Sequence, residues 1–315
     1  MRFNPKARLD TGRVSDGGGR TGGGLGGGAM RLPIPGGAKA GGGIGGLIII
    51  ILLVVLQQCL AGGGGGTGGA GGAFDTSQVA AGDSERYDNC KTGEDANTDA
   101  DCKRIGVENS LRDYWAQTLF EETGVQFQPA TMKTFSGSVS TGCGNATSQV
   151  GPFYCPADGQ IYMDTSFFDE VLRKQLAGPD GGFVEPYVLA HEYGHHIQNL
   201  LGTMGQVRTQ QGPRSDAVRL ELQADCFAGM WARAAPQTSD SNGEPLVTDI
   251  TETDIREAIA AAEAVGDDRI QQKTQGQVTE ESWTHGSAAS RMKWFQIGLS
   301  KGTVDGCDTW AVDTP

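Results

Sequence analysis

Residues 188–202 read VLAHEYGHHIQNLLG, and they hold three of the four histidines of this 315-residue chain. His191 and His195 are four residues apart, so in a helix both imidazoles lie on one face. That spacing lets both rings bind the same metal ion. Glu192 follows the first ring and is placed to bind the metal's water rather than the metal. The stretch therefore predicts a zinc-binding helix with its own general base, and the alternative is a helix with two surface or core histidines.

The helix that carries this motif is expected to run from Glu185 to Leu201. Pro186 is well tolerated in a first helical turn, and Gly202 is a common residue just after a last turn. His196 directly follows the second metal-binding histidine, and the 3.6-residue period turns it about 100° away. We expect His196 to pack against or hydrogen-bond its neighbours, and not to bind the metal.

A catalytic zinc site needs a third protein ligand and an open position for water. A histidine at the HExxHxxGxxH spacing is absent, because Gln198 and Leu201 fill those positions. The segment RLELQADCFAGMWA (219–232) instead has an apolar helical pattern in which Glu221 and Asp225 share one face. We expect Glu221 to be the third ligand and Asp225 to accept the other ring N–H of a zinc histidine. An ordinary solvated helix carboxylate is the alternative for Glu221.

Together with GDDRIQ (266–271) and THGSAASRMKWFQIG (284–298), these segments resemble the neutral zinc metallopeptidase family of bacterial membrane-anchored proteins. More broadly, they resemble zincins in which HExxH pairs with a later ExxxD. The resemblance covers roughly residues 85–310. It implies a zincin-like fold with Zn²⁺ as the cofactor. It also implies site residues: the ligands His191, His195 and Glu221, the catalytic Glu192 and the supporting carboxylate Asp225.

The chemistry that fits these residues is metal-assisted hydrolysis of a peptide or protein substrate. Glu192 would take a proton from the attacking water and pass it to the leaving amine. The tetrahedral oxyanion needs a further donor besides the metal. His285, which lies outside the motif, is the catalytic candidate for this role, with Tyr162 or Tyr187 as substitutes. The alternative for His285 is a capping or core role, since Ser287 fits a helix N-cap.

Two other functions would use the same residues. One is a non-catalytic binding or chaperone-like protein with a structural metal on a zincin scaffold. Glu192 argues against it, because a purely structural metal site needs no general base. The other is a zinc hydrolase that acts on cell-wall crosslinks, which the sequence does not separate from a peptidase.

The N-terminal part has a different composition. The chain contains fifty glycines, with a dense cluster from Gly17 to Gly72, and such sequence is typical of flexible linkers. Within this cluster residues 44–56 carry no charge, and the apolar run extends to Ala61, which predicts a transmembrane helix over 41–61. A cleaved signal peptide is the alternative, although a forty-residue leading region is long for one.

The net charge also differs between the N-terminal part and the rest of the chain. Residues 1–40 carry a net charge of +5 and the rest carry −18, which favours a cytoplasmic N-terminus and an extracytoplasmic domain in a single-pass cell-membrane protein. An acidic folded part argues against a nucleic-acid partner. We expect four parts: a cytoplasmic Gly-rich basic tail (1–40), the anchor (41–61), a Gly-rich linker (62–84) and the metallopeptidase domain (85–315).

Six cysteines follow the predicted anchor, and they fit disulfides in an oxidising compartment. Fifteen pairings are possible. The local spacings favour Cys90–Cys102 and Cys143–Cys155, which leaves Cys226–Cys307. The absence of a CxxC pair argues against a cysteine zinc site.

Periodicity predicts an α+β fold that is mostly helical with a small sheet. Besides the motif helix, helical patterns cover 108–124, 166–178, 215–235, 253–268 and 287–302, and strand-like pieces cover 125–144, 148–155 and 159–165. The strand GQIYMDT (159–165) is expected to bind an extended peptide by backbone pairing. The remaining expectations are a helix-end role for Asp267, Asp268 and Arg269, and core positions for Trp231, Trp283 and Trp294.

Overall fold

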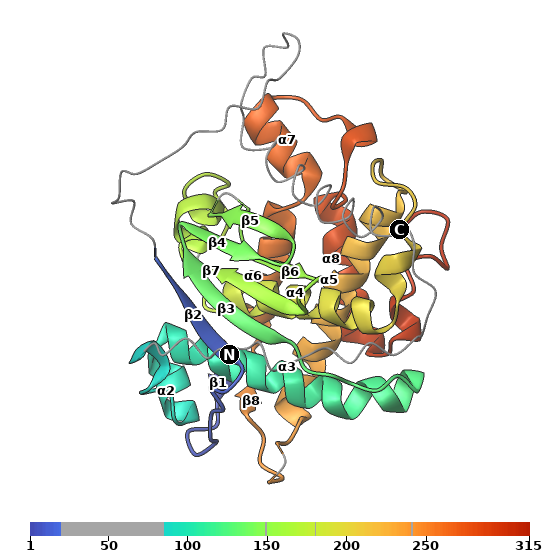
Figure 1. The fold of residues 1–315 in the computed structure, drawn as a ribbon. Coiled ribbons are helices and arrows are strands. Elements are labelled where there is room, and N and C mark those ends of the chain that lie inside the picture. Colours follow the sequence, from blue (N-terminus) through green and yellow to red (C-terminus); the bar gives the residue numbers. More distant parts are fainter. Residues whose placement is uncertain (20–84, 149, 180, 241) are drawn as a thin grey trace, which may run out of the picture.

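A small sheet packs against a group of helices in the computed structural model, which describes residues 1–19, 85–148, 150–179, 181–240 and 242–315 (Figure 1). The helices are α2 (Gly93–Thr98), α3 (Ala100–Thr123), α4 (Val184–Leu200), α5 (Asp216–Ala234), α6 (Glu252–Ala264), α7 (Asp267–Gln275) and α8 (Ala288–Lys301). The strands are β1 (Arg2–Phe3), β2 (Val14–Gly19), β3 (Thr131–Ser136), β4 (Ser138–Thr141), β5 (Gly144–Thr147), β6 (Phe153–Cys155), β7 (Gln160–Asp164) and β8 (Val247–Asp249). This mixture confirms the predicted α+β class.

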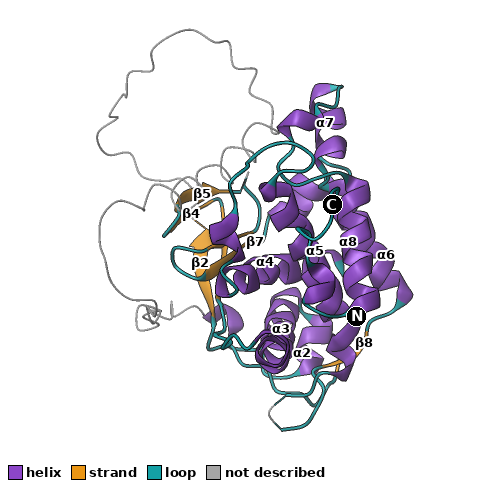
Figure 2. Cartoon of the chain, turned by 90° about the vertical axis from the view of Figure 1, so that its right-hand side faces the viewer, coloured by secondary structure: helices purple, strands orange, loops and turns teal. Residues whose placement is uncertain are grey.

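The main sheet has the strand order β2–β3–β7–β6. Strands β2, β3 and β7 are parallel, whereas β6 runs antiparallel to β7. The strands of this sheet lie to one side of the helices, and α4 contacts β6 and β7 on one side and α5 on the other (Figure 2). The motif helix therefore lies between the sheet and the remaining helices, where its polar side chains are shielded from water.

Three predicted helices are found within one residue of their expected ends. Helix α4 ends before Gly202, whose φ of 75° is left-handed and stops the helix. Helix α5 begins after Ser215, whose side chain accepts the N–H of Val218. Helix α8 likewise begins after Ser287, as predicted for that N-cap.

Other boundaries differ from the prediction. Helix α3 starts at Ala100 and not at 108, because Asp99 accepts the N–H groups of Asp101 and Cys102 and so caps an earlier turn. The predicted helix at 166–178 is reduced to a short π-type segment, Phe168–Arg173. The helix predicted over 253–268 is divided into α6 and α7, and α7 continues to Gln275.

Residues 1–19 belong to the folded domain, in contrast to the predicted tail over 1–40. Strand β1 pairs antiparallel with β8, and β2 pairs parallel with β3. Phe3 is fully buried and Ala7 is nearly so. These apolar residues are widely spaced among charged ones, so their burial depends on surfaces that only the folded domain provides.

The predicted anchor (41–61), the linker (62–84) and residues 20–40 of the predicted tail lie outside the described residues. Among the helices that the structure describes, none is long and apolar enough to cross a bilayer. The anchor therefore stays a prediction.

The predicted disulfide pairing is confirmed. The structure contains the bonds Cys90–Cys102, Cys143–Cys155 and Cys226–Cys307. The last of these closes a sequence separation of 81 residues and ties α5 to the C-terminal part of the chain. The core positions of the tryptophans are also confirmed, since Trp231, Trp283 and Trp294 are all buried.

The strand predicted to bind substrate is an inner strand. Strand β7 pairs with β3 on one side and with β6 on the other, so its backbone groups already have partners. The prediction that GQIYMDT pairs with a peptide is therefore wrong. The outer strand on this side of the sheet is β6, which follows from the antiparallel hairpin that the sequence pattern did not resolve.

Candidate metal centre and active site

Three side chains from two helices converge as the sequence predicts. His191 and His195 come from α4 and Glu221 comes from α5, and all three are buried. The Nε2 atoms of the two histidines lie 3.2 and 3.4 Å from the two carboxylate oxygens of Glu221. One ligand atom from each residue lies within 4.8 Å of the others, which suits a shared metal ion.

The other ring nitrogen of each histidine is held by a separate acceptor. Nδ1 of His191 donates to Oδ1 of Asp225 at 2.9 Å, as predicted for that carboxylate. Nδ1 of His195 donates to Oε1 of Gln198 at 2.8 Å. The amide of Gln198 is itself fixed, because its Nε2 donates to the carbonyl of Leu220 at 2.7 Å. These bonds leave both Nε2 atoms as the candidate metal-binding nitrogens.

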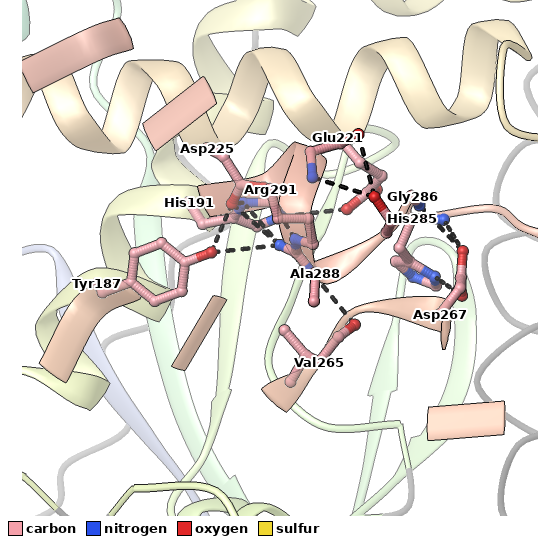
Figure 3. A network of polar contacts seen from close by, with 12 residues as sticks. Tyr187, His191, Glu221, Asp225, Val265, Asp267, His285, Gly286, Ala288 and Arg291 are labelled. Atoms are coloured by element: carbon pink, nitrogen blue, oxygen red, sulfur yellow. Dashed lines mark hydrogen bonds and ion pairs between the residues drawn. The ribbon is translucent and has the colours of Figure 1, made fainter. Parts of the chain in front are cut away.

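Arg291 of α8 completes the support of Asp225 (Figure 3). Its Nε and Nη2 donate to the two oxygens of Asp225 at 2.8 and 3.0 Å, a bidentate arrangement. The hydroxyl of Tyr187 donates to the same carboxylate at 2.5 Å. Asp225 is fully buried, so this pairing is what allows it to remain charged.

Sequence reasoning missed both Arg291 and Gln198. Gln198 lies three residues after His195, which places it on the same helix face, and this spacing is a signal that could have indicated its role. Arg291 lies 66 residues beyond Asp225 in the chain. Its charge did not single it out in the sequence, because Lys293 is a second cation in the same helical segment.

The buried carboxylates of Glu221 and Asp225 favour a positive charge beside them. Burial disfavours charge on His191, but the carboxylates of Asp225 and Glu221 outweigh it and raise its pKa to about 10. Burial also opposes ionisation of Glu221, yet the two histidines hold its pKa well below the usual range. For His195 burial dominates and lowers the pKa to about 4, so this ring is neutral near neutral pH.

This donor set fits Zn²⁺. Two imidazole nitrogens and one carboxylate are the ligands of many catalytic zinc sites, and they leave a fourth position open. The bonds to Nδ1 of both histidines are the supporting contacts that such ligands normally have. The other cluster of possible metal ligands among the described residues is Cys90, Asp99 and Cys102, and its two cysteines form a disulfide and offer no thiolate.

A cavity of about 420 Å³ opens onto these ligands. Glu192 lines it beside the histidines and is 7% exposed. Burial raises the pKa of Glu192 to about 7, although a hydrogen bond from the backbone of Tyr154 acts in the opposite direction. A carboxyl with this pKa exchanges a proton readily near neutral pH, which suits a general base.

His285 lines the same cavity from the loop before α8. Asp267 holds this loop, because its Oδ2 accepts the backbone N–H groups of Thr284, His285 and Gly286. Nδ1 of His285 lies 3.4 Å from Oδ1 of Asp267. Burial disfavours the charged ring, but Asp267 and Glu221 outweigh it and raise the pKa of His285. Asp267 thus supports His285 in addition to starting α7.

The remaining candidates are placed elsewhere. Tyr162 donates its hydroxyl to Asp158 at 2.7 Å and stacks on Phe153, and it is not among the residues that line the cavity. His196 is buried behind the motif, with Nε2 2.6 Å from the carbonyl of Gln128. The prediction that His196 packs and hydrogen-bonds rather than binding metal agrees with this position.

Two uncharacterized bacterial proteins are similar to most of this chain. The uncharacterized protein Rv2575 of Mycobacterium tuberculosis (strain ATCC 25618 / H37Rv) is 49% identical over 224 residues, which are 70% of this chain and 74% of the relative. The uncharacterized protein YpfJ of Escherichia coli (strain K12) is 43% identical over 208 residues, which are 64% of this chain and 68% of the relative. No solved structure matches, so the zincin-like fold stays a prediction.

Residues 4–310 match the family described as "Putative neutral zinc metallopeptidase". The match includes both candidate metal-binding segments, the residues that line the cavity and strand β2. Since it covers nearly the whole chain, the protein belongs to the neutral zinc metallopeptidase family.

Proposed function

We propose that this protein is a zinc-dependent peptidase that hydrolyses peptide bonds in its cavity. The observation that carries the proposal is the position of Glu192. This buried carboxyl lines the same cavity as His191, His195 and Glu221, and its pKa lies near neutrality. A site that only bound a structural metal would have no use for an acid–base group there.

The chain's own groups divide the reaction between them. Zinc, when bound by the three ligands, supplies Lewis acidity toward a water molecule and the scissile carbonyl. Glu192 accepts the proton of the attacking water and then delivers it to the leaving amine. Asp225 and Gln198 keep the two imidazoles in the orientation that ligation requires.

His285 is proposed as the donor to the oxyanion. Its raised pKa favours the protonated ring, which is the better hydrogen-bond donor to developing negative charge. Asp267 fixes the loop and bonds one ring nitrogen, which leaves the other available for the substrate. The hydroxyl of Tyr187 is committed to Asp225, which makes it a weaker candidate.

The walls of the cavity support an extended peptide with apolar side chains. Strand β6 contributes Phe153 and Tyr154 to the lining, and as the outer strand of the sheet it offers an edge for backbone pairing. Apolar residues from α4, α5 and the loop between them line the cavity too: Val188, Met204, Val207 and Leu220.

The test is zinc content and peptide cleavage of the Glu192→Gln variant. Glutamine keeps the size of the side chain but cannot accept the proton, so cleavage should fall by about 10²-fold or more while zinc stays stoichiometric. Glu244→Gln, at an exposed position, is the matched control and should leave both unchanged. A peptide library provides the substrates.

The outcomes separate the candidate functions. Wild-type protein that binds zinc but cleaves no peptide would favour the binding or chaperone-like function. Cleavage restricted to cell-wall crosslinks would favour the other hydrolase. Full cleavage by the Glu192→Gln variant would contradict the proposed role of Glu192.

A further inference from the structure

The N-terminal residues 1–19 lie on the domain in the manner of a bound peptide. Their backbone is held along its length by main-chain hydrogen bonds to three separate parts of the domain. These bonds join Asn4 N–H to Leu246 O, Gly93 N–H to Ala7 O, Leu9 N–H to Lys91 O, and Met132 N–H to Arg13 O, with lengths of 2.8–3.0 Å.

Two asparagines each form hydrogen bonds to both the backbone N–H and the carbonyl of one residue of the segment. Asn97 of α2 accepts the N–H of Phe3 at 2.8 Å and donates to its carbonyl at 3.0 Å. Asn109 of α3 does the same with Asp10, at 2.7 and 2.9 Å. A side-chain amide carries one acceptor and two donors, so this contact matches an extended backbone.

Phe3 anchors the segment. Its ring is fully buried and belongs to the main hydrophobic core. The ring packs against Gly106 of α3, where an added Cβ would lie 2.6 Å from the phenylalanine ring. Only glycine leaves room for the ring, even though glycine weakens a helix interior.

Charge pairs fix the register of the segment. Arg112 of α3 pairs with the side chain of Asp10 at 2.7 Å, the same residue whose backbone groups bond Asn109. Arg86 lies 3.5 Å from Asp16, next to the pairing of β2 with β3. The surface therefore selects this sequence through an aromatic anchor, two pairs of backbone hydrogen bonds and two ion pairs.

We propose that residues 1–19 are a recognition segment, and that α2, α3, β3 and β8 form a groove that binds it as a peptide ligand. The segment is joined to Glu85 through residues 20–84, whose composition is that of a long linker. Binding therefore depends on the contacts above and not on a short covalent connection. The groove accepts the same sequence when it is supplied as a separate peptide.

Docking of residues 1–19 determines on which side of a membrane the N-terminus lies. A segment that docks on the domain lies on the same side of any membrane as the domain. A single crossing by residues 41–61 would put the two on opposite sides. Docking of residues 1–19 thus predicts that a tag at the N-terminus and a tag at the C-terminus are labelled from the same side in intact cells.

The test uses the full chain with a site-specific protease sequence inserted between Gly24 and Leu25. After folding and cutting, the N-terminal fragment should remain bound, as seen by size-exclusion chromatography and mass spectrometry. A fluorescent peptide of residues 1–19 should displace it in a saturable manner. A cut protein that releases the fragment and takes up no peptide overturns the proposal.

Groove variants sharpen the result. Asn97→Ala and Asn109→Ala each remove the two hydrogen bonds that the asparagine makes to the segment. Each should weaken peptide binding by about 10- to 100-fold. Gln117→Ala is the matched control, since this exposed amide of α3 donates to Ser239 and not to the segment. Equal peptide affinity in all three variants would contradict the proposal that Asn97 and Asn109 bind the segment.

Gly106→Ala separates docking from folding. Alanine favours the helix over glycine, so the domain freed of its fragment should not melt at a lower temperature. The added methyl group collides with Phe3, so peptide affinity should fall by about tenfold or more. Unchanged affinity would overturn the anchor role of Phe3. These measurements follow binding alone, so they do not depend on whether the cavity hydrolyses peptides.

Discussion

Asp225 accepts the Nδ1–H of His191 at 2.9 Å, although 34 residues separate the two in the chain. This bond fixes the tautomer of the imidazole, so that Nε2 faces Glu221 at 3.2 Å. Asp225 in turn is held by Arg291 from a third helix. The orientation of one metal ligand thus depends on how α4, α5 and α8 pack together.

Removal of the third ligand should abolish zinc binding. Glu221→Ala leaves only two histidines, and two ligands hold zinc poorly. Asp225→Asn should keep zinc but weaken it by about 10- to 100-fold, because the imidazole loses a charged acceptor. Zinc retained after dialysis against a graded chelator measures both. Glu252→Ala, on the exposed side of α6, is the control, and equal zinc loss in all three variants would contradict the assignment.

The pair Arg291–Asp225 should behave as one unit. Arg291→Met leaves Asp225 buried without its partner, which should lower the free energy of unfolding by about 3 kcal/mol or more. Asp225→Asn in the same chain removes the orphaned charge and should restore part of the loss. Denaturant unfolding of the metal-free wild type, both single variants and the double variant measures the coupling. Strictly additive changes would show that the two side chains do not support each other.

His285 should affect the rate and not the metal. His285→Ala removes the proposed donor to the oxyanion, so kcat should fall by about 10²- to 10³-fold with a small change in KM. Zinc content and melting temperature serve as controls, since a purely structural histidine would change the melting temperature instead. Peptide cleavage kinetics provide the measurement. A normal kcat would mean that another group binds the oxyanion.

A buried carboxyl away from the cavity should make stability depend on pH. Oε1 of Glu108 has no hydrogen-bond partner among the described residues, while Oε2 accepts a bond from Asn109. Burial raises the pKa of Glu108 to about 7. The folded chain therefore favours the neutral acid, and this contribution to stability is complete below the unfolded value of about 4.5 and is lost as pH rises to about 7.

Glu108→Gln should remove that dependence. The difference in unfolding free energy between variant and wild type should grow from pH 4 to pH 8, in favour of the variant, by about 3 kcal/mol. Glu121→Gln, exposed on the same helix, is the matched control. Denaturant titrations at several pH values measure the difference. Parallel stability curves for wild type and Glu108→Gln would contradict the raised pKa of Glu108 in the folded chain.

The helical parts of the site were predictable because their signals are local. The four-residue spacing of His191 and His195, and that of Glu221 and Asp225, follows directly from the helical period. The caps at Ser215 and Ser287 are likewise encoded by neighbouring residues. The position of Glu221 beside the two histidines was predictable because a helical face with two carboxylates offers few alternatives.

Contacts between distant segments were not predictable in this way. The choice of β6 over β7 as the outer strand depends on which strands pair, and a short apolar run gives no information about its neighbours. The same holds for Arg291, whose role exists only because α8 crosses α5 beside Asp225.

The sequence by itself predicted the candidate ligands and the candidate general base, because each depends on residue type and spacing along one helix. It also predicted the three disulfide pairs, two from short local spacings and Cys226–Cys307 as the pair that remained. Tertiary structure alone decided what holds those ligands in place and where residues 1–19 lie. The backbone groups of Phe3 and Asp10 bond Asn97 and Asn109, which lie 94 and 99 residues further along the chain. Such contacts form when the hydrophobic core closes, since burial acts between segments without regard to their distance in sequence.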